Sequence, residues 1–216
     1  MGMEIAGCPP EPEHGCPLCP RLVAYRAQNR AAEPDWFNGP APSFGDPDAW
    51  LLVVGLAPGR TGANRTGRPF TGDWAGDLLY ATLDKVGLSR GTYRARPDDG
   101  LALTGVMITN AVRCAPPGNK PETTEIAACN PFLAARIAAL PRLTTVICLG
   151  RIAHDATLKA LGGRPSRHSF AHAARHSVAG RTLFDSYHCS RYNTNTGRLT
   201  APMFEAVFEA ALASRV

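Results

Sequence analysis

The chain has 216 residues, of which 44% are apolar and 19% charged, a composition typical of a globular protein with one sizeable core. We therefore expect a single domain over residues 1–216, with residues 1–15 as a flexible tail. No apolar run approaches the roughly 18 residues of a membrane span, and the start lacks the pattern of a signal peptide, so we expect neither a membrane protein nor an exported one.

The positive charge is carried almost entirely by arginine. The formal net charge is +5, and only Lys85, Lys120 and Lys159 are lysines, so 20 of the 23 basic residues are arginines. Arginine pairs with phosphate through two hydrogen bonds, which favours a polyanionic partner. An arginine-rich composition inherited from a GC-rich genome explains the same count equally well.

From residue 50 onward, apolar strands alternate with helical patterns. The predicted strands cover residues 51–57, 105–111, 144–150 and 182–188. The predicted helices cover residues 21–30, 75–87, 122–139, 151–161 and 200–213. Continuous apolar strands between helices indicate βαβ units with a sheet covered on both faces. The sequence thus predicts a three-layer α/β/α fold with a central four-stranded parallel sheet, whose functional loops leave the carboxyl ends of the strands.

The loop after the first strand, "GLAPGRTGANRTGRPFTGD" (residues 55–73), does not suit a nucleotide phosphate. Its closest approach to a phosphate-binding loop lacks the lysine and the magnesium-binding hydroxyl, and Pro69 removes a backbone donor. What remains is Phe70 between flexible glycines, an arrangement that can stack on a nucleobase. The alternatives are that Phe70 fills the core and that Asp73 caps the following helix.

Seven cysteines without an export signal favour metal binding or catalysis over disulfides. Cys16 and Cys19 form a C-x2-C pair, and Cys114 and Cys129 stand fifteen positions apart. Four thiolates suit zinc or an iron–sulfur cluster equally well, and a small buried residue is the alternative for Cys114. Cys148 lies in an apolar strand and is predicted to be buried.

Three segments together resemble the uracil-DNA glycosylase superfamily, most of all its family 5 (type B) enzymes. They are "GLAPG…NRTGRPFTGD", "TNAVRCAPPGNKP…C" and "SYHCSRYNTNTGRLT", and the resemblance runs from about Cys16 to Met203. It implies a DNA repair enzyme that flips a deaminated base, such as uracil or hypoxanthine, out of damaged DNA and hydrolyses its N-glycosidic bond without cutting the strand. It further implies a monomer that works inside a bacterial or archaeal cell.

The resemblance assigns two catalytic residues. His188 matches the histidine that donates to the base oxygen as it becomes anionic. Asp73 matches the aspartate that orients the attacking water and stabilises the positive sugar. Related families carry a polar residue at the position of Leu56, which cannot activate water, so the resemblance favours Asp73.

The resemblance also assigns residues that touch the substrate. Phe70 is expected to stack on the base, Asn110 to read its edge through both amide groups, and Gly55 and Ala57 to border it. Contacts to the DNA backbone are expected from a wider set, each of which is alternatively a plain solvated side chain: Asn64, Arg65, Lys120, Ser190, Arg191, Asn193 and Arg198.

By the same resemblance, Cys16, Cys19, Cys114 and Cys129 align with the ligands of a structural [4Fe–4S] cluster, and zinc is the second choice. Two features depart from the family or remain outside it. Cys189 stands where many relatives have a proline. His168, His172 and His176 recur at four-residue steps; a second metal site is conceivable there, but no carboxylate or cysteine lies nearby in the sequence, which favours a loop or DNA-facing role.

Two other functions compete with the glycosylase. The first is a DNA-binding protein that recognises damage with a degenerate pocket and no catalysis, against which the presence of both Asp73 and His188 argues. The second is a zinc-stabilised nucleotide hydrolase, which the absence of a phosphate-binding loop disfavours.

Overall fold

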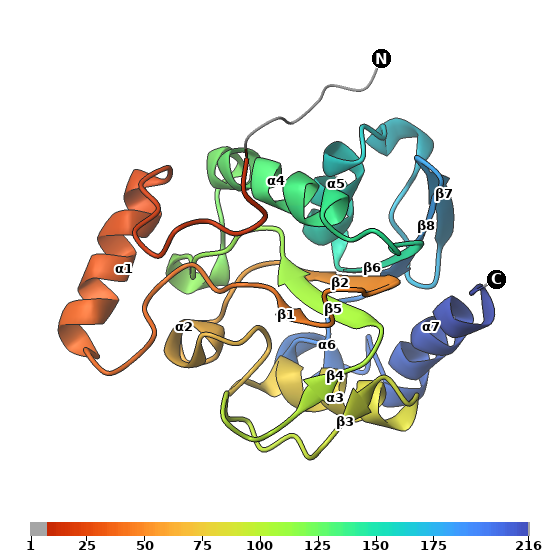
Figure 1. Cartoon of the computed structure of the whole chain (residues 1–216), viewed down its shortest axis with the longest axis horizontal. Helices are drawn as coiled ribbons and strands as arrows, with labels where there is room; N and C mark the ends of the chain where they lie inside the picture. Colours follow the sequence, from red (N-terminus) through yellow and green to blue (C-terminus); the bar gives the residue numbers. More distant parts are fainter. Residues whose placement is uncertain (1–7, 216) are drawn as a thin grey trace.

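The computed structural model describes residues 8–215 and is built on a sheet with the strand order β1-β5-β2-β6-β8-β7 (Figure 1). The four inner strands are parallel and adjacent, and they are β5 (Val106–Asn110), β2 (Leu51–Gly55), β6 (Thr145–Leu149) and β8 (Arg181–Ser186). Every residue of β2, β5 and β6 is buried. Burial on both faces explains why these strands are mainly apolar rather than alternating between apolar and polar residues. The four predicted strands are confirmed.

The prediction of a four-stranded sheet is wrong, because two antiparallel edge strands complete it. β1 (Phe44–Gly45) pairs with β5, and β7 (Arg175–Val178) pairs with β8. β1 has two residues, too few for a sequence pattern, and β7 lies half exposed at the edge, where polar side chains hide the strand signal. A separate pair, β3 (Ser89–Arg90) and β4 (Ala102–Leu103), stands outside the main sheet.

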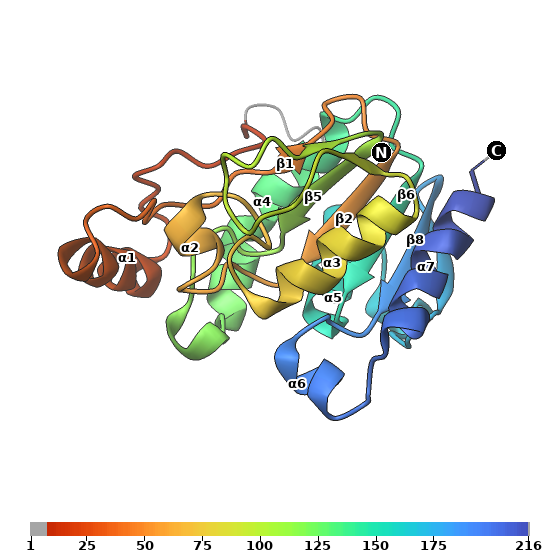
Figure 2. The ribbon, with the colours of Figure 1, turned by 90° about the horizontal axis from the view of Figure 1, so that it is seen from below.

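Helices cover both faces of the sheet. Leu51 and Val53 of β2 pack with α3 (Trp74–Lys85) and α7 (Ala201–Ala213). The intervening Leu52 and Val54 pack with the other helix pair, α4 (Thr123–Ala138) and α5 (Arg151–Ala160). Figure 2 shows α3 and α7 on the near face of the sheet. The alternation of side chains along β2 therefore divides the core into two halves.

The remaining helices lie beside the sheet or in its loops. α1 (Pro20–Ala32) stands to one side of it, near α2 (Ala63–Thr66), in both views (Figures 1 and 2). α6 (Arg191–Asn195) follows β8, and the short 3₁₀ turns are η1 (Pro117–Asn119) and η2 (Pro165–Arg167). No helix within residues 8–215 is both long and apolar enough to cross a bilayer.

The expected tail at residues 1–15 is only partly within the described range. Residues 1–7 lie outside it. The carboxylate of Glu11 accepts hydrogen bonds from Arg113 at 2.9 Å and from Arg136, so this part of the segment is held against the domain. The single-domain expectation stays a prediction.

Candidate active site

A cavity of about 660 Å³ opens at the carboxyl ends of the parallel strands. It is lined by the loop after β2, the first turn of α3, Asn119 after β5, the turn from β6 into α5, and the segment from His188 into α6. Ala57, Asp73, His188, Ser190 and Arg191 all line it. Parallel strands end at one edge of a sheet, so segments far apart in the sequence meet there.

Gly55, Phe70 and Asn110 meet at one point beside this cavity. A Cβ atom added to Gly55 would lie 2.5 Å from the Asn110 Oδ1 atom and 2.5 Å from the Phe70 ring, so glycine is required there. The Phe70 ring stacks on the His188 ring with 6.0 Å between centroids, and His188 lines the cavity. Phe70 is buried, so the packing alternative holds in this structure, yet its ring also forms part of the site.

The backbone of Phe70 is held in a conformation that costs free energy. Its φ is 53°, in the left-handed region that a bulky side chain rarely adopts, and such strain persists only when the surroundings enforce it. The hydroxyl of Tyr93 donates to the Phe70 carbonyl at 3.2 Å, and that of Tyr80 donates to the Pro69 carbonyl at 2.7 Å. These two hydrogen bonds therefore hold the backbone of the loop in place.

A buried arginine anchors the same loop. Arg68 donates to both oxygens of Asp99, at 2.8 and 2.7 Å, and to the Thr71 hydroxyl at 2.7 Å. Its guanidinium lies within 6 Å of the rings of Phe44 and Tyr80. The hydrogen bond from Arg68 holds the pKa of Asp99 far below its usual range. The sequence analysis missed this pair, because 31 positions separate its members.

Asn110 carries the clearest unsatisfied group of the site. It ends β5 and is buried, and its Oδ1 atom has no hydrogen-bond partner within residues 8–215. A buried acceptor without a donor costs roughly 1–3 kcal/mol. Within the described residues, this acceptor therefore remains an unfavourable feature of the fold.

The two carboxylate oxygens of Asp73 have different surroundings. It is the N-cap of α3, and its Oδ1 atom accepts from the Gly76 backbone N–H at 3.2 Å, so the capping alternative is confirmed. Its Oδ2 atom faces the glycine turn after β2, since a Cβ atom on Gly62 would lie 2.2 Å from it. Burial raises the pKa of Asp73, although the N–H groups of the helix oppose this.

His188 faces the cavity as a neutral imidazole. Surrounding protein lowers its pKa to about 4, so the ring carries one N–H donor at neutral pH. Its backbone carbonyl accepts from the Asn193 side chain at 2.8 Å, so Asn193 fixes the His188 segment. Cys189 is fully buried, and its thiol donates to the Ala75 carbonyl at 3.5 Å. Cys189 thus ties the His188 segment to the first turn of α3.

The seven residues expected to contact DNA fall into three groups. Ser190 and Arg191 line the cavity, and Ser190 also caps α6. Arg65, Lys120 and Arg198 are exposed outside the cavity lining. Asn193 holds the His188 segment, and Asn64 is buried and donates to the Asn38 side chain at 3.0 Å, so these two side chains are engaged inside the protein.

An aromatic and basic rim, which was not predicted from the sequence, surrounds the cavity. Trp74 is 49% exposed, its indole N–H donates to the Thr194 hydroxyl at 2.9 Å, and the Arg191 guanidinium lies 5.6 Å from its ring. Arg60 and Arg151 also line the cavity. The available signal was a tryptophan directly after the helix cap Asp73, where the first turn of a helix is open to solvent.

Cys16, Cys19, Cys114 and Cys129 come together between α1, α4 and the loop after β5, among Leu22, Val112 and Phe132. All are free thiols. Arg26 donates to the Cys114 sulfur and the Arg113 backbone N–H to the Cys129 sulfur, both at 3.3 Å. Burial raises the pKa of Cys114 to about 11 and that of Cys129 to about 12, so a bound cation is needed to make them thiolates at neutral pH.

The four cysteines can hold a metal group, since they gather at one place in the fold. Within residues 8–215, the one group of three or more metal-ligating side chains with ligand atoms all within 4.8 Å contains no cysteine. Four thiolates suit either zinc or an iron–sulfur cluster.

Comparison with known proteins agrees with the resemblance seen in the sequence. The family model "UDG: Uracil DNA glycosylase superfamily" matches residues 42–212. The type-5 uracil-DNA glycosylase of Thermus thermophilus is 50% identical over 90% of this chain and 92% of its own length. That of Pyrobaculum aerophilum is 41% identical over 92% of this chain and 88% of its own. The type-4 uracil-DNA glycosylase of P. aerophilum is 36% identical over 70% of this chain and 64% of its own.

Proposed function

The chain belongs to the uracil-DNA glycosylase superfamily, and from this we propose that it is a DNA repair enzyme that removes uracil from DNA by hydrolysing the bond between base and sugar. One observation supports the assignment to this site: Asp73 and His188 line one cavity, while Phe70 stacks on the His188 ring and lies with Asn110 against Gly55. We extend the substrates to hypoxanthine on the family resemblance.

The base is recognised by the group at Gly55. Phe70 stacks on the base, Gly55 lets the base approach the backbone, and Ala57 borders it on the cavity side. The free Oδ1 atom of Asn110 accepts from the N3–H of uracil, while the amide N–H₂ donates to O4. Binding of the base satisfies the buried acceptor that the protein itself leaves unpaired.

Bond cleavage leaves negative charge on the base and positive charge on the sugar. The neutral His188 ring donates its N–H to the base oxygen as that charge develops, which costs no proton transfer beforehand. The Oδ2 atom of Asp73 orients the attacking water and stabilises the sugar cation. The other oxygen keeps the carboxylate fixed on the helix N-terminus. We propose that the enzyme removes the base and does not cut the DNA strand.

DNA lies across the rim of the cavity. Ser190 and Arg191 contact its phosphates, with Arg60, Arg151 and the Trp74 ring beside them. Arg65, Lys120 and Arg198 contribute positive charge farther out. Asn64 and Asn193 act indirectly, by holding the loops that carry the site. We propose that one copy of the chain suffices, in the interior of a bacterial or archaeal cell.

Cys16, Cys19, Cys114 and Cys129 hold a [4Fe–4S] cluster, which we propose from the family resemblance and from the gathering of the four thiols between α1, α4 and the loop after β5. When bound, the cluster supplies a rigid link between segments distant in sequence and no step of base removal. Arg26 and the Arg113 backbone N–H donate to the ligand sulfurs and offset their negative charge. α1 is positioned by this link, and Arg60 of the cavity in turn hydrogen-bonds Asn29 of α1 at 2.8 Å.

The decisive experiment uses a duplex with a single uracil. Wild-type protein is expected to release free uracil and leave an alkali-labile site, without cutting the strand on its own. Asp73→Ala is expected to bind the duplex and leave the base in place, whereas Asp77→Ala, an exposed aspartate in the same first turn, retains activity. Tight binding by the wild type with an intact base would instead identify the non-catalytic damage-binding protein.

A further inference from the structure

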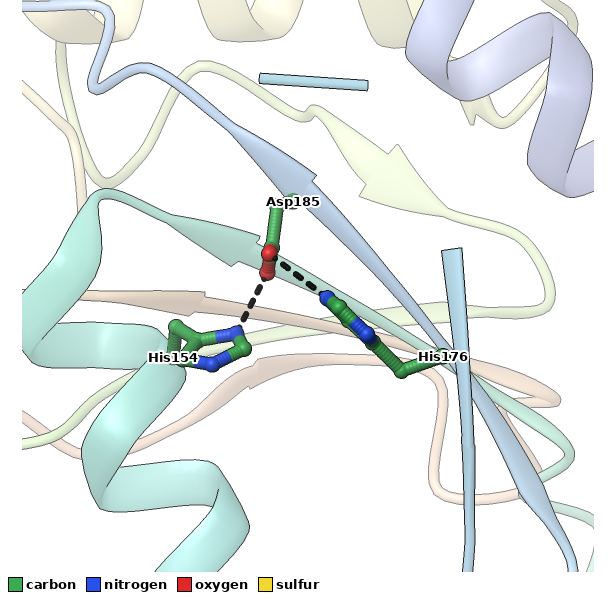
Figure 3. Close-up of side chains that lie close together, drawn as sticks. All are labelled: His154, His176 and Asp185. Carbon is green, nitrogen blue, oxygen red and sulfur yellow. Dashed lines mark hydrogen bonds and ion pairs between the residues drawn. The ribbon is translucent and has the colours of Figure 1, made fainter. Parts of the chain in front are cut away.

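His154, His176 and Asp185 form a compact polar cluster that the glycosylase chemistry does not use (Figure 3). Asp185 lies on β8, His176 on the edge strand β7 and His154 on α5. Asp185 and His154 are fully buried, and the His176 side chain is 12% exposed. The sequence shows no carboxylate near His176, but the antiparallel pairing of β7 with β8 brings Asp185 beside it. The expectation that His176 is a loop or DNA-facing residue is therefore wrong.

A neutral His154 ring has fewer N–H donors than its two neighbouring acceptors require. Its Nδ1 atom lies 2.7 Å from Asp185 Oδ1, and its Nε2 atom lies 2.8 Å from the His168 carbonyl oxygen. Both neighbours only accept hydrogen bonds, while a neutral imidazole has a single N–H. Both contacts are favourable if the buried ring carries a second proton, if Asp185 is protonated and donates to the Nδ1 atom, or if the Nδ1 lone pair binds a cation.

The same geometry is that of a metal-bound histidine. Metal-ligating histidines commonly donate their second N–H to a backbone carbonyl, which fixes the tautomer, and the His168 carbonyl does this for His154. His176 directs its Nε2 atom to the other Asp185 oxygen at 3.0 Å. The three ligand atoms lie within 4.8 Å of one another. Ligands around a tetrahedral zinc ion stand about 3.3 Å apart, from bonds of about 2.0–2.1 Å, so small shifts suffice.

We propose that His154, His176 and Asp185 bind one Zn²⁺ ion, separate from the cysteine cluster. Two imidazoles and a carboxylate are a common zinc ligand set, and water takes the fourth position. The Phe170 ring lies 5.7 Å from the His154 ring and shields it. The ion joins α5, β7 and β8. It thereby clamps the strand that leads into His188 and the helix whose first residues, Arg151 and Ile152, line the cavity.

The test titrates purified protein, with its cysteine site loaded, with Co²⁺ as a spectroscopic substitute for zinc. We expect one additional Co²⁺ per chain. The difference spectrum against the protein before Co²⁺ addition should show weak visible d–d absorption and no new strong near-ultraviolet bands of thiolate ligands. Zn²⁺ should displace it and raise the melting temperature. His176→Ala should abolish both effects, and it is placed at a half-exposed edge strand where folding survives. Asp185→Asn should abolish them as well.

His168→Gln is the matched control, because it removes a neighbouring imidazole while keeping the carbonyl that accepts from His154. It should bind Co²⁺ as the wild type does. The proposal is overturned if the wild type takes up no extra ion, if the spectrum shows thiolate ligands, or if His176→Ala binds as well as the wild type. Each of these outcomes would make the cluster a hydrogen-bonded structural group only.

Discussion

The thiol of Cys189 donates a hydrogen bond to the backbone carbonyl of Ala75, with 3.5 Å between sulfur and oxygen. Ala75 lies in the first turn of α3, two residues after Asp73, and Cys189 directly follows His188. This contact therefore joins the two segments that carry the proposed catalytic pair. In this chain a buried thiol and its packing hold the loop after His188.

Replacing Cys189 with alanine should therefore affect turnover as well as stability. We expect Cys189→Ala to lower the free energy of unfolding by about 1 kcal/mol and to lower kcat several-fold, because His188 is less well fixed. Cys148→Ala is the control, since Cys148 is equally buried but lies within β6. It should lose similar stability and keep its kcat. Equal kcat values in the two variants would refute the positioning role of Cys189.

The two oxygens of Asp73 can be tested separately. Asn is as good an N-cap as Asp, so Asp73→Asn should change the free energy of unfolding by less than about 0.5 kcal/mol. It should nevertheless reduce single-turnover uracil release by about 10²–10⁴-fold, the usual effect of losing a positioned base. Asp77→Asn, in the same helical turn, should change neither the free energy of unfolding nor the rate of uracil release. A large loss of stability without loss of the chemical step would show that Asp73 only caps the helix.

We expect the Asn110 side chain to lower the stability of the fold and to contribute to recognition of the base. Asn110→Leu removes the unpaired buried Oδ1 atom at similar volume, so the free energy of unfolding should stay equal or rise. The value of kcat/KM for uracil should fall at least about 100-fold, because the base loses its polar partner. Asn130→Leu is the contrast: Asn130 donates to the Ala156 carbonyl at 2.8 Å, and its loss should destabilise the fold. Both effects are measured by urea unfolding and steady-state kinetics.

The low pKa of His188 has a defined effect on stability. The folded chain binds its proton only near pH 4, whereas an unfolded histidine titrates near about 6.5. Protons therefore favour the unfolded state, and the free energy of unfolding should fall as the pH drops from about 6.5 to about 4. The fall should be smaller in His188→Gln, by up to about 3 kcal/mol. Parallel pH profiles for the two proteins would contradict the burial of His188.

The rim of the cavity should control DNA affinity. Arg191→Ala is expected to weaken binding of all duplexes similarly and to reduce the slope of log K against log salt by about 1, since one phosphate contact is lost. Trp74→Ala should weaken binding with less change in that slope, because its ring carries no charge. Arg96→Ala is a control, because Arg96 pairs with Asp98 away from the cavity. Titrations at several salt concentrations separate the three variants.

Local patterns in the sequence were enough to predict the four inner strands, the helices between them and the loops at their carboxyl ends. Fully buried parallel strands need apolar residues at every position, so they are visible without knowledge of their neighbours. The family, and the roles expected for Asp73, Phe70, Asn110 and His188, came instead from the resemblance of three segments, which lie at those strand ends. The edge strands β1 and β7 escaped because they are short or half exposed.

Contacts between distant residues were decided only by the tertiary structure. The sequence does not show that Asn64 turns inward to Asn38, that Arg68 pairs with Asp99, or that Cys189 reaches Ala75. Nor does it place Asp185 between His154 and His176, since these residues meet only when β7 turns back along β8 and α5 packs on the sheet. The sequence shows where each strand ends and which side chains follow it, because strand ends are visible in the local pattern of apolar and polar residues. Which of them share a hydrogen bond, a proton or a metal ion depends on packing across the sheet.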